Sequence, residues 1–215
     1  LIITALPAFY AIYLRRKLPD SPKFKTSGEP KQSAIQKVAA LWSREYAKRT
    51  LMLWIVWFTV VFSYYGMFLW LPSVMVLKGF SMIHSFGYVL LMTLAQLPGY
   101  FTAAWLIERL GRKFVLSTYL LGTALSALAF GNAESLTALL IFGALLSFFN
   151  LGAWGALYAY SPEQYPTSIR ATGAGTAAAV GRIGGIFGPL LVGSLLSGGY
   201  GFGLIFGIFC GAIII

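Results

Sequence analysis

The stretch SLTALLIFGALLSFFNLGAWGALYAYSP, residues 135–162, has no Asp, Glu, Lys or Arg in 28 consecutive positions. A membrane-spanning helix needs about 20 apolar residues, because a rise of about 1.5 Å per residue must cross a hydrocarbon layer roughly 30 Å thick. The stretch is long enough, and it does not alternate polar with apolar residues as a barrel strand does. It therefore predicts a transmembrane helix.

Four further charge-free runs have the same character. These runs are residues 50–77, 79–107, 114–133 and 183–215. Spans are predicted near residues 51–77, 86–107, 114–131, 136–160 and 171–197, of which the last contains one Arg, with partial spans at 1–14 and 202–215. Hydrophobic residues make up 58% of the chain and charged residues 10%, whereas about 25% of a soluble protein is charged. So few charges cannot cover a water-soluble globule, and the sequence indicates an all-α integral membrane protein.

The basic residues are distributed very unevenly. Lys and Arg number 16 against 6 acids, and 14 of the 16 lie in the segments 15–50, 108–113 and 161–170. The intervening loops at 78–85, 132–135 and 198–201 contain only Lys78. Because Lys and Arg accumulate on the cytoplasmic side, the three rich segments are predicted to be cytoplasmic in a cell membrane. The formal charge of +10 thus marks orientation rather than a nucleic-acid partner.

Residues 15–50 form the one sizeable polar segment. The prolines in LPDSP at 18–22 end the preceding helix. Residues 33–49 then predict a helix on the membrane surface, with an apolar face that includes Val38, Leu41 and Trp42. We therefore expect the end of a transmembrane helix at 1–14, a cytoplasmic loop with an interfacial helix at 15–50, and a transmembrane bundle at 51–215. Both ends lie in apolar helix, so we expect the chain to be part of a longer protein whose last helix is truncated here.

One basic residue, Arg182, belongs to neither side. It lies 11 residues into the 171–197 span, about 16 Å from the cytoplasmic end of that span. An Arg at a helix centre costs roughly 2.5–3.5 kcal/mol, so it should face a partner or a water-filled cavity. Its planar fork suits a carboxylate ligand, although a structural partner such as a backbone carbonyl or an acid remains the alternative. Glycines spaced four apart around it favour close helix packing.

Polar aromatic residues recur at helical spacing in three spans. Asn150, Trp154 and Tyr158 share one face, Gln96 and Tyr100 share another, and two adjacent tyrosines lie at 64 and 65. Together with an Arg, such residues would form a box for a flat aromatic anion. Several tryptophans are expected instead to face lipid or the interfacial aromatic belt: Trp54, Trp57, Trp70 and Trp105.

Catalytic and metal-binding patterns are missing from the sequence. The single Cys, Cys210, lies in an apolar helix, and the single His, His84, has no Cys, Asp or Glu nearby. A metal centre or a Ser/His/Asp site needs partners that the sequence does not supply. We therefore expect no enzyme activity, no metal and no cofactor.

Three loop motifs resemble signatures of the major facilitator superfamily. They are LPDSPK at 18–23, ERLGRK at 108–113 and PEQYPTSIR at 162–170. The resemblance implies the major facilitator fold, here its C-terminal six-helix bundle plus the end of helix six. Within the superfamily, FSYYGMFLWLP at 62–72, LAQLPGY at 94–100, SFFNLGAWG at 147–155 and GRIGG at 181–185 resemble bacterial niacin transporters, which belong to a group of organic-ion and metabolite:proton symporters.

This resemblance implies a monomeric secondary transporter that takes up nicotinate or a similar aromatic carboxylate by alternating access, with protons as the candidate coupling ion. Arg182 would hold the carboxylate, and Tyr64, Tyr65, Trp154 and Tyr158 would line the pocket. Gln96, Tyr100 and Asn150 complete the predicted substrate site. A gating motif at the cytoplasmic face would comprise Glu108, Arg109, Gly111, Arg112, Lys113, Glu163 and Arg170. A carrier for a benzoate-like acid or a sugar, and a non-transporting receptor, are the alternatives.

Overall fold

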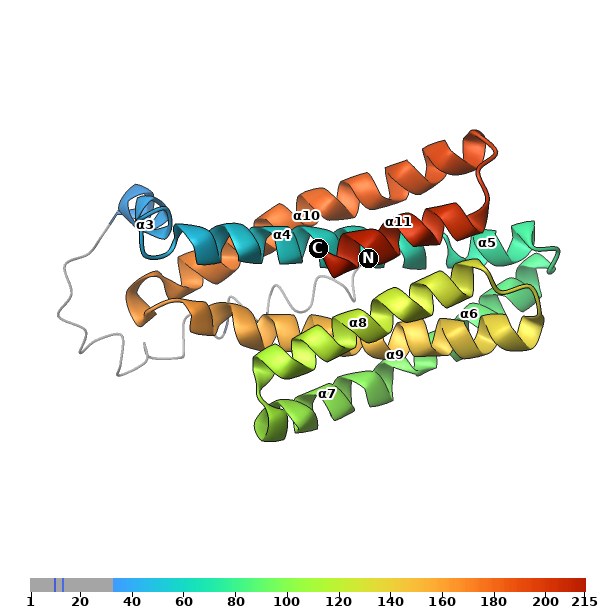
Figure 1. The fold of residues 1–215 in the computed structure, drawn as a ribbon, viewed down its shortest axis with the longest axis horizontal. Helices are drawn as coiled ribbons and strands as arrows, with labels where there is room; N and C mark the ends of the chain where they lie inside the picture. Colours follow the sequence, from blue (N-terminus) through green and yellow to red (C-terminus); the bar gives the residue numbers. More distant parts are fainter. Residues whose placement is uncertain (1–9, 11–12, 14–32) are drawn as a thin grey trace. The chain divides into compact units, whose positions relative to one another are not determined.

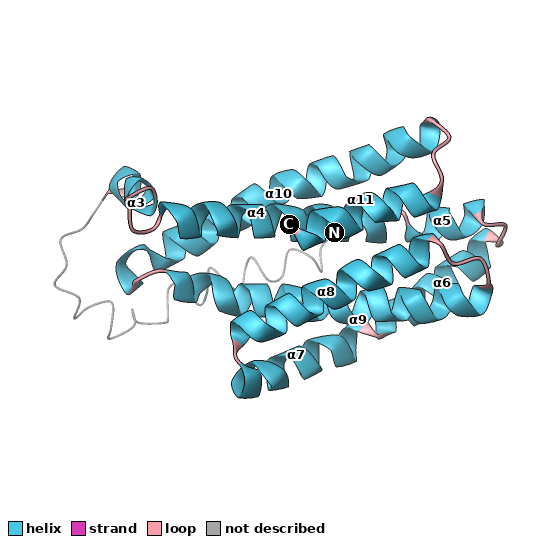
Figure 2. Ribbon diagram, viewed as in Figure 1, coloured by secondary structure: helices cyan, strands magenta, loops and turns pink. Residues whose placement is uncertain are grey.

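The computed structural model describes residues 10, 13 and 33–215, and all regular elements within them are helices (Figures 1 and 2). The chain divides into two compact units, Leu1–Ser33 and Ala34–Ile215. In the first unit the rings of Tyr10 and Tyr13 stack 6.4 Å apart. The rest of the predicted partial span at 1–14, and the proline motif at 18–22, lie outside the described residues.

The second unit contains α3 to α11, joined by short turns (Figure 1). In chain order the helices are α3 (Ala34–Leu41), α4 (Ala47–Phe68), α5 (Leu71–Leu77), α6 (Met82–Leu94), α7 (Gln96–Leu110), α8 (Arg112–Gly131), α9 (Leu136–Tyr160), α10 (Thr167–Ser197) and α11 (Phe202–Ile214). A short 3-10 helix, Ser161–Gln164, joins α9 to α10. Five helical segments are long and apolar enough to cross a membrane, as the charge-free runs predict.

Two of the predicted spans are interrupted. The span expected at 51–77 breaks at Leu69 and Trp70, between α4 and α5, and the span expected near 86–107 breaks at Ala95, between α6 and α7. A proline ring clashes with the carbonyl four residues earlier and offers no N–H. For Pro72 and Pro98 those carbonyls belong to residues 68 and 94, the last residues of α4 and α6. By contrast, α10 continues through Pro189.

The helix predicted at 33–49 is also wrong in part, because α3 ends at Leu41 and α4 begins at Ala47. Val38 and Trp42 are exposed as an interfacial helix requires, but Leu41 is fully buried. Tertiary hydrogen bonds explain the early end. The Thr50 hydroxyl donates to the Leu41 carbonyl (3.0 Å), and the Tyr165 hydroxyl donates to Thr50 Oγ1 (3.0 Å). The end of α3 is thereby fixed to the beginning of α4 and to the turn before α10.

Removing the Tyr165 hydroxyl tests how much its hydrogen bond to Thr50 contributes to stability. We expect Tyr165→Phe to lower the free energy of unfolding by about 1 kcal/mol, because one buried hydrogen bond is lost while the ring still fills its site. Burial raises the pKa of the Tyr165 phenol, so its hydroxyl remains a donor throughout the neutral range. Thermal unfolding of the purified protein checks this, and an unchanged midpoint would contradict it. Tyr200→Phe, at an exposed tyrosine of the α10–α11 turn, is the control.

The turns lie alternately at the two ends of the bundle. Those joining α3 to α4, α7 to α8 and α9 to α10 lie towards one end, and those joining α5 to α6, α8 to α9 and α10 to α11 towards the other (Figure 1). Residues 108–113 and 161–170, which carry Arg109, Arg112, Lys113 and Arg170, lie in the first group. The arrangement is that of a multi-pass membrane protein whose loop charges are segregated by side.

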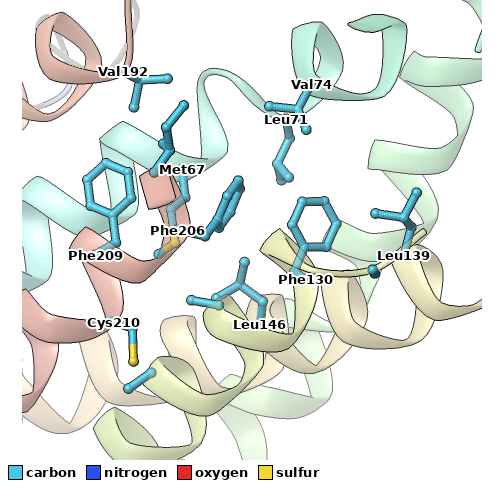
Figure 3. Packing of buried hydrophobic residues seen from close by; sticks show 14 of the residues in the cluster. Met67, Leu71, Val74, Phe130, Leu139, Leu146, Val192, Phe206, Phe209 and Cys210 are labelled. Atoms are coloured by element: carbon cyan, nitrogen blue, oxygen red, sulfur yellow. The ribbon is translucent and has the colours of Figure 1, made fainter. Parts of the chain in front are cut away.

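The most extensive contact between helices joins α4 to α10, because glycines let the two backbones approach. Gly184 and Gly188 are buried in α10, and a Cβ at Gly184 would lie 2.5 Å from the Phe58 carbonyl oxygen of α4. We call this contact the α4–α10 seam. Beside it, a buried apolar cluster joins α4, α5, α8, α9, α10 and α11, with Met67, Phe130 and Phe209 among its members (Figure 3). Together the seam and the cluster fix the position of α10 and of Arg182 on it.

Candidate functional site

Arg182 lies at the midpoint of α10. The helix starts at Thr167, four residues earlier than the sequence predicts, so 15 residues separate Arg182 from either end (182−167 and 197−182). At 1.5 Å per residue the Arg182 Cα is about 22 Å from both ends of the helix. This depth is greater than the one expected from the sequence, and the side chain cannot reach an interface by extending along the helix.

The Arg182 guanidinium contacts α4. Its Nη1 donates a hydrogen bond to the Tyr65 hydroxyl at 3.2 Å. The one ion pair among residues 33–215 lies elsewhere, between Arg112 and Glu163, so within the described part no acid neutralises Arg182. The side chain is exposed on the surface of this bundle. A guanidinium at mid-helix with free donors and a single neutral partner is suited to binding an anion.

An aromatic cluster lies beside Tyr65. Tyr64 of α4 meets Trp154 of α9 edge to face at 4.9 Å, and the Tyr65 ring lies 6.4 Å from the same indole. Tyr158, one turn further along α9, lies 6.4 Å from Trp154. We call the set Tyr64, Tyr65, Trp154 and Tyr158 the aromatic box. Through the hydrogen bond from Arg182 to Tyr65, the box and the guanidinium form one continuous group.

Trp57 belongs to this region, contrary to the expectation that it faces lipid. It is 2% exposed and meets the rings of Tyr158 at 4.8 Å and Trp154 at 6.4 Å. Its indole N–H donates to the Ser161 hydroxyl at 2.8 Å, and that hydroxyl donates to the Leu157 carbonyl. The N–H group of the buried Trp57 indole is therefore paired with Ser161, which is 104 residues further along the chain. The sequence carried a signal for this position, because Trp57 lies seven residues before Tyr64 on α4 and so shares its helix face.

Of the three other tryptophans expected to face lipid or the aromatic belt, Trp105 is exposed and Trp54 and Trp70 are half-buried. Trp105 is 55% exposed, with the Arg109 guanidinium over its ring at 4.1 Å. Trp54 is half-buried against Trp42, and Trp70 donates to the Pro189 carbonyl of α10 at 3.1 Å. For Trp54 and Trp70 the expected contact with lipid or the aromatic belt is thus replaced, in part, by contacts within the protein.

The three remaining predicted substrate residues differ in position. The Gln96 side chain interacts with the Tyr64 hydroxyl and so belongs with the box. Asn150 is buried one turn before Trp154 on α9, and its Oδ1 has no hydrogen-bond partner. Tyr100 packs on Gly155 instead, where an added Cβ would lie 2.9 Å from its ring. It lines a cavity between α7 and α9.

The predicted gating residues gather at the basic end. Arg112 Nη1 and Glu163 Oε1 form an ion pair at 2.6 Å, which joins the beginning of α8 to the 3-10 helix. Gly111 makes the α7–α8 turn with φ of +85°, a conformation that favours glycine. Arg170 Nε donates to the Tyr165 carbonyl at 3.3 Å rather than to an acid. Lys113 is exposed, and Glu108 lines the same cavity as Arg112.

Comparison with known proteins places the chain among membrane transporters. The sequence profile described as "Major Facilitator Superfamily" matches residues 82–215. A Bacillus subtilis protein named for niacin/nicotinamide transport is 68% identical over 215 residues, which is 100% of this chain and 54% of that protein. The niacin transporter NiaP of Acinetobacter baylyi is 46% identical over 97% of this chain and 54% of its own length. The 3-(3-hydroxy-phenyl)propionate transporter of Escherichia coli is 36% identical over 91% of this chain and 48% of its own length. The chain thus spans about half the length of these relatives.

Proposed function

We propose, from the premise that this chain belongs to the major facilitator superfamily, that it takes part in the secondary active uptake of a small aromatic carboxylate, nicotinate in particular. Two relatives are named for niacin transport. A third is named for a phenylpropionate, and a Pseudomonas putida relative for gallate. All of these compounds carry one aromatic ring and one carboxylate, which defines the chemical class.

The observation that carries the proposal is the pairing of Arg182 with the aromatic box. The guanidinium hydrogen-bonds to Tyr65 and has no acid partner within the described part, so it can bind a carboxylate through two parallel bonds. The ring of the substrate would then lie against Tyr64 and Trp154, whose own rings are 4.9 Å apart. An apolar wall with one oriented charge is typical of a small-molecule site.

A sugar is the less favoured substrate. A sugar site needs several amides and hydroxyls, and in the box region only Gln96, Asn150 and the tyrosines supply them. Uptake of labelled nicotinate by cells that lack their own carrier tests the proposal. We expect unlabelled nicotinate to compete fully, benzoate to compete weakly, and glucose not to compete. Competition by glucose as strong as that by nicotinate would contradict the assignment.

Proton entry with the substrate is part of the same proposal. Moving an anion into a negative cytoplasm costs about 2.3 kcal/mol per 100 mV of membrane potential, and one proton cancels that charge. Uptake should therefore fall when a protonophore collapses the proton gradient of the same cells. The orientation that we propose puts residues 15–50, 108–113 and 161–170 on the cytoplasmic side of the cell membrane.

Alternating access needs contacts that close the cytoplasmic side and then break. We assign this role to the ion pair of Arg112 and Glu163, whose side chains are 41% and 46% exposed. Because an exposed pair contributes only about 0–1 kcal/mol, it can bias the balance between two states without locking either of them.

Weakening the pair should make the site more accessible from the cytoplasm. We expect Glu163→Gln to raise, by up to about fivefold, the rate at which a cytoplasmic, membrane-impermeant maleimide labels Ala179→Cys. Ala179 is exposed one turn from Arg182 on α10, and the native Cys210 is buried. Glu134→Gln, at an acid of the opposite end, is the control. An unchanged or slower labelling rate in Glu163→Gln would contradict the gating role.

A further inference from the structure

Trp57 of α4 lies in contact with the aromatic box and with the helix that carries Arg182. Its ring meets two members of the box, Trp154 and Tyr158, with centroids 6.4 and 4.8 Å away. Its backbone packs against α10, because a Cβ added at Gly181 would lie 3.1 Å from the Trp57 carbonyl oxygen. Trp57 thus touches α9 and α10, two of the helices that carry proposed substrate residues.

The indole N–H of Trp57 is bonded to the turn that follows α9. It donates to the Ser161 hydroxyl at 2.8 Å, and Ser161 is the first residue of the 3-10 helix. Trp57 is 2% exposed and Ser161 is 1% exposed. Because both groups are buried, breaking this bond leaves a buried donor without a partner, so the two residues should move together.

The same short helix carries the acid of the cytoplasmic ion pair. Glu163 lies two residues after Ser161 and pairs with Arg112 at the beginning of α8. A second bond to α4 follows, because the Tyr165 hydroxyl donates to Thr50 Oγ1 at 3.0 Å. Glu163 is therefore held between two bonds to α4. Of the two, the bond at Ser161 is made by a residue that also contacts the box.

Two sites become coupled when both of them act on the same structural element. A substrate ring that lies against Trp154 and Tyr158 acts on Trp57, which both side chains contact. Movement of the 3-10 helix, when the ion pair breaks, acts on Trp57 through Ser161. The indole is thus the element that the box and the cytoplasmic turn share.

We propose that Trp57 is a positioning residue, which couples occupancy of the aromatic box to the Arg112–Glu163 ion pair through its hydrogen bond to Ser161. The inference rests on the proposed function, since it takes the box as the substrate site and the ion pair as the cytoplasmic gate. A closed ion pair holds the rings of the box in the arrangement that binds an aromatic ring. By reciprocity, a bound ring favours the closed pair.

A double-mutant cycle on nicotinate affinity, measured by equilibrium dialysis with the complete purified protein, tests the coupling. We expect Glu163→Gln alone to weaken nicotinate binding about fivefold, at the lower end of coupling between sites. Trp57→Phe keeps a ring but loses the N–H, and in its presence Glu163→Gln should have no further effect. Ser161→Ala removes the acceptor without changing a ring and should behave in the same way. Tyr165→Phe removes the other bond to α4 and is the matched control, because Glu163→Gln should keep its effect there.

A second measurement needs no substrate. Trp57→Phe should raise the cytoplasmic maleimide labelling of Ala179→Cys to the rate found for Glu163→Gln, and combining the two should add nothing. Ser161→Ala should do the same if Trp57→Phe does not yield a monodisperse protein.

Either of two results would overturn the coupling. Additive effects of Trp57→Phe and Glu163→Gln on nicotinate affinity would show that Trp57 only supports the box. Unchanged labelling in Trp57→Phe and Ser161→Ala would show that the indole does not act on the ion pair. Absence of nicotinate binding to the unmodified protein would instead contradict the proposed function, and the labelling rates would still decide whether Trp57 holds the turn.

Discussion

Arg182→Ala is expected to reduce nicotinate uptake on the order of 100-fold. Hydrogen bonds to a charged group contribute about 1.5–3 kcal/mol each, and every 1.4 kcal/mol is a factor of ten in affinity. Removal of the guanidinium also leaves the carboxylate without a counter-charge at a depth where water is scarce. Initial uptake rates of labelled nicotinate, measured at equal amounts of protein in the membrane, give the ratio.

Two further variants separate charge from geometry at this position. Arg182→Lys keeps the charge but loses the planar fork, so we expect partial uptake between that of the unmodified protein and that of Arg182→Ala. Ile183→Ala changes the next, half-exposed residue of α10 and should retain uptake. If Arg182→Ala transported nicotinate at the unmodified rate, Arg182 would not be the anion site.

The second large effect is expected at the α4–α10 seam, where Gly188→Ala should prevent normal packing. A Cβ at Gly188 would collide with the Phe62 carbonyl oxygen and lie 3.0 Å from the Gly66 amide nitrogen. Both obstacles are backbone atoms, which cannot turn aside as a side chain can. Overpacking of this kind costs about 1–3 kcal/mol, and more where the backbone has to move.

The readout is the yield of monodisperse protein and its thermal midpoint in detergent. We expect Gly188→Ala to lose most of the folded yield, and the material that does fold should unfold at a lower temperature. Gly175→Ala is the matched control, because it lies in the same helix and an added Cβ there meets no atom within 4 Å. Equal yields and midpoints for the two variants would show that the seam tolerates a wider separation.

How well the sequence predicts each part of this structure depends on how local the signal is. A long run of residues without charge predicts a membrane-crossing segment, because the cost of burying charges in lipid adds up residue by residue. The proline breaks after Phe68 and Leu94 are local as well, and their sequence signal, a proline four residues ahead, was available. The early end of α3 is not local, because it depends on Thr50 and Tyr165.

The candidate site shows the same division. Helical spacing places Trp154 and Tyr158 on one face of α9, and depth in the span marks Arg182 as exceptional. Spacing does not show which helices become neighbours. The contact of Trp57 with Tyr158 and its bond to Ser161 follow from how α4 packs against α9 and the turn beyond it.

The sequence by itself therefore determined the membrane class, the order of the spans, the side on which the basic loops gather and the one Arg that lies between the sides. Each of these follows from the transfer of individual residues between water and lipid, which depends on composition along the chain. Only the tertiary structure decided that Tyr65 is the partner of Arg182 and that Tyr100 lines a cavity between α7 and α9. Distances between helices are set by the side chains and glycines at their contacts, and those contacts exist only once the bundle has packed.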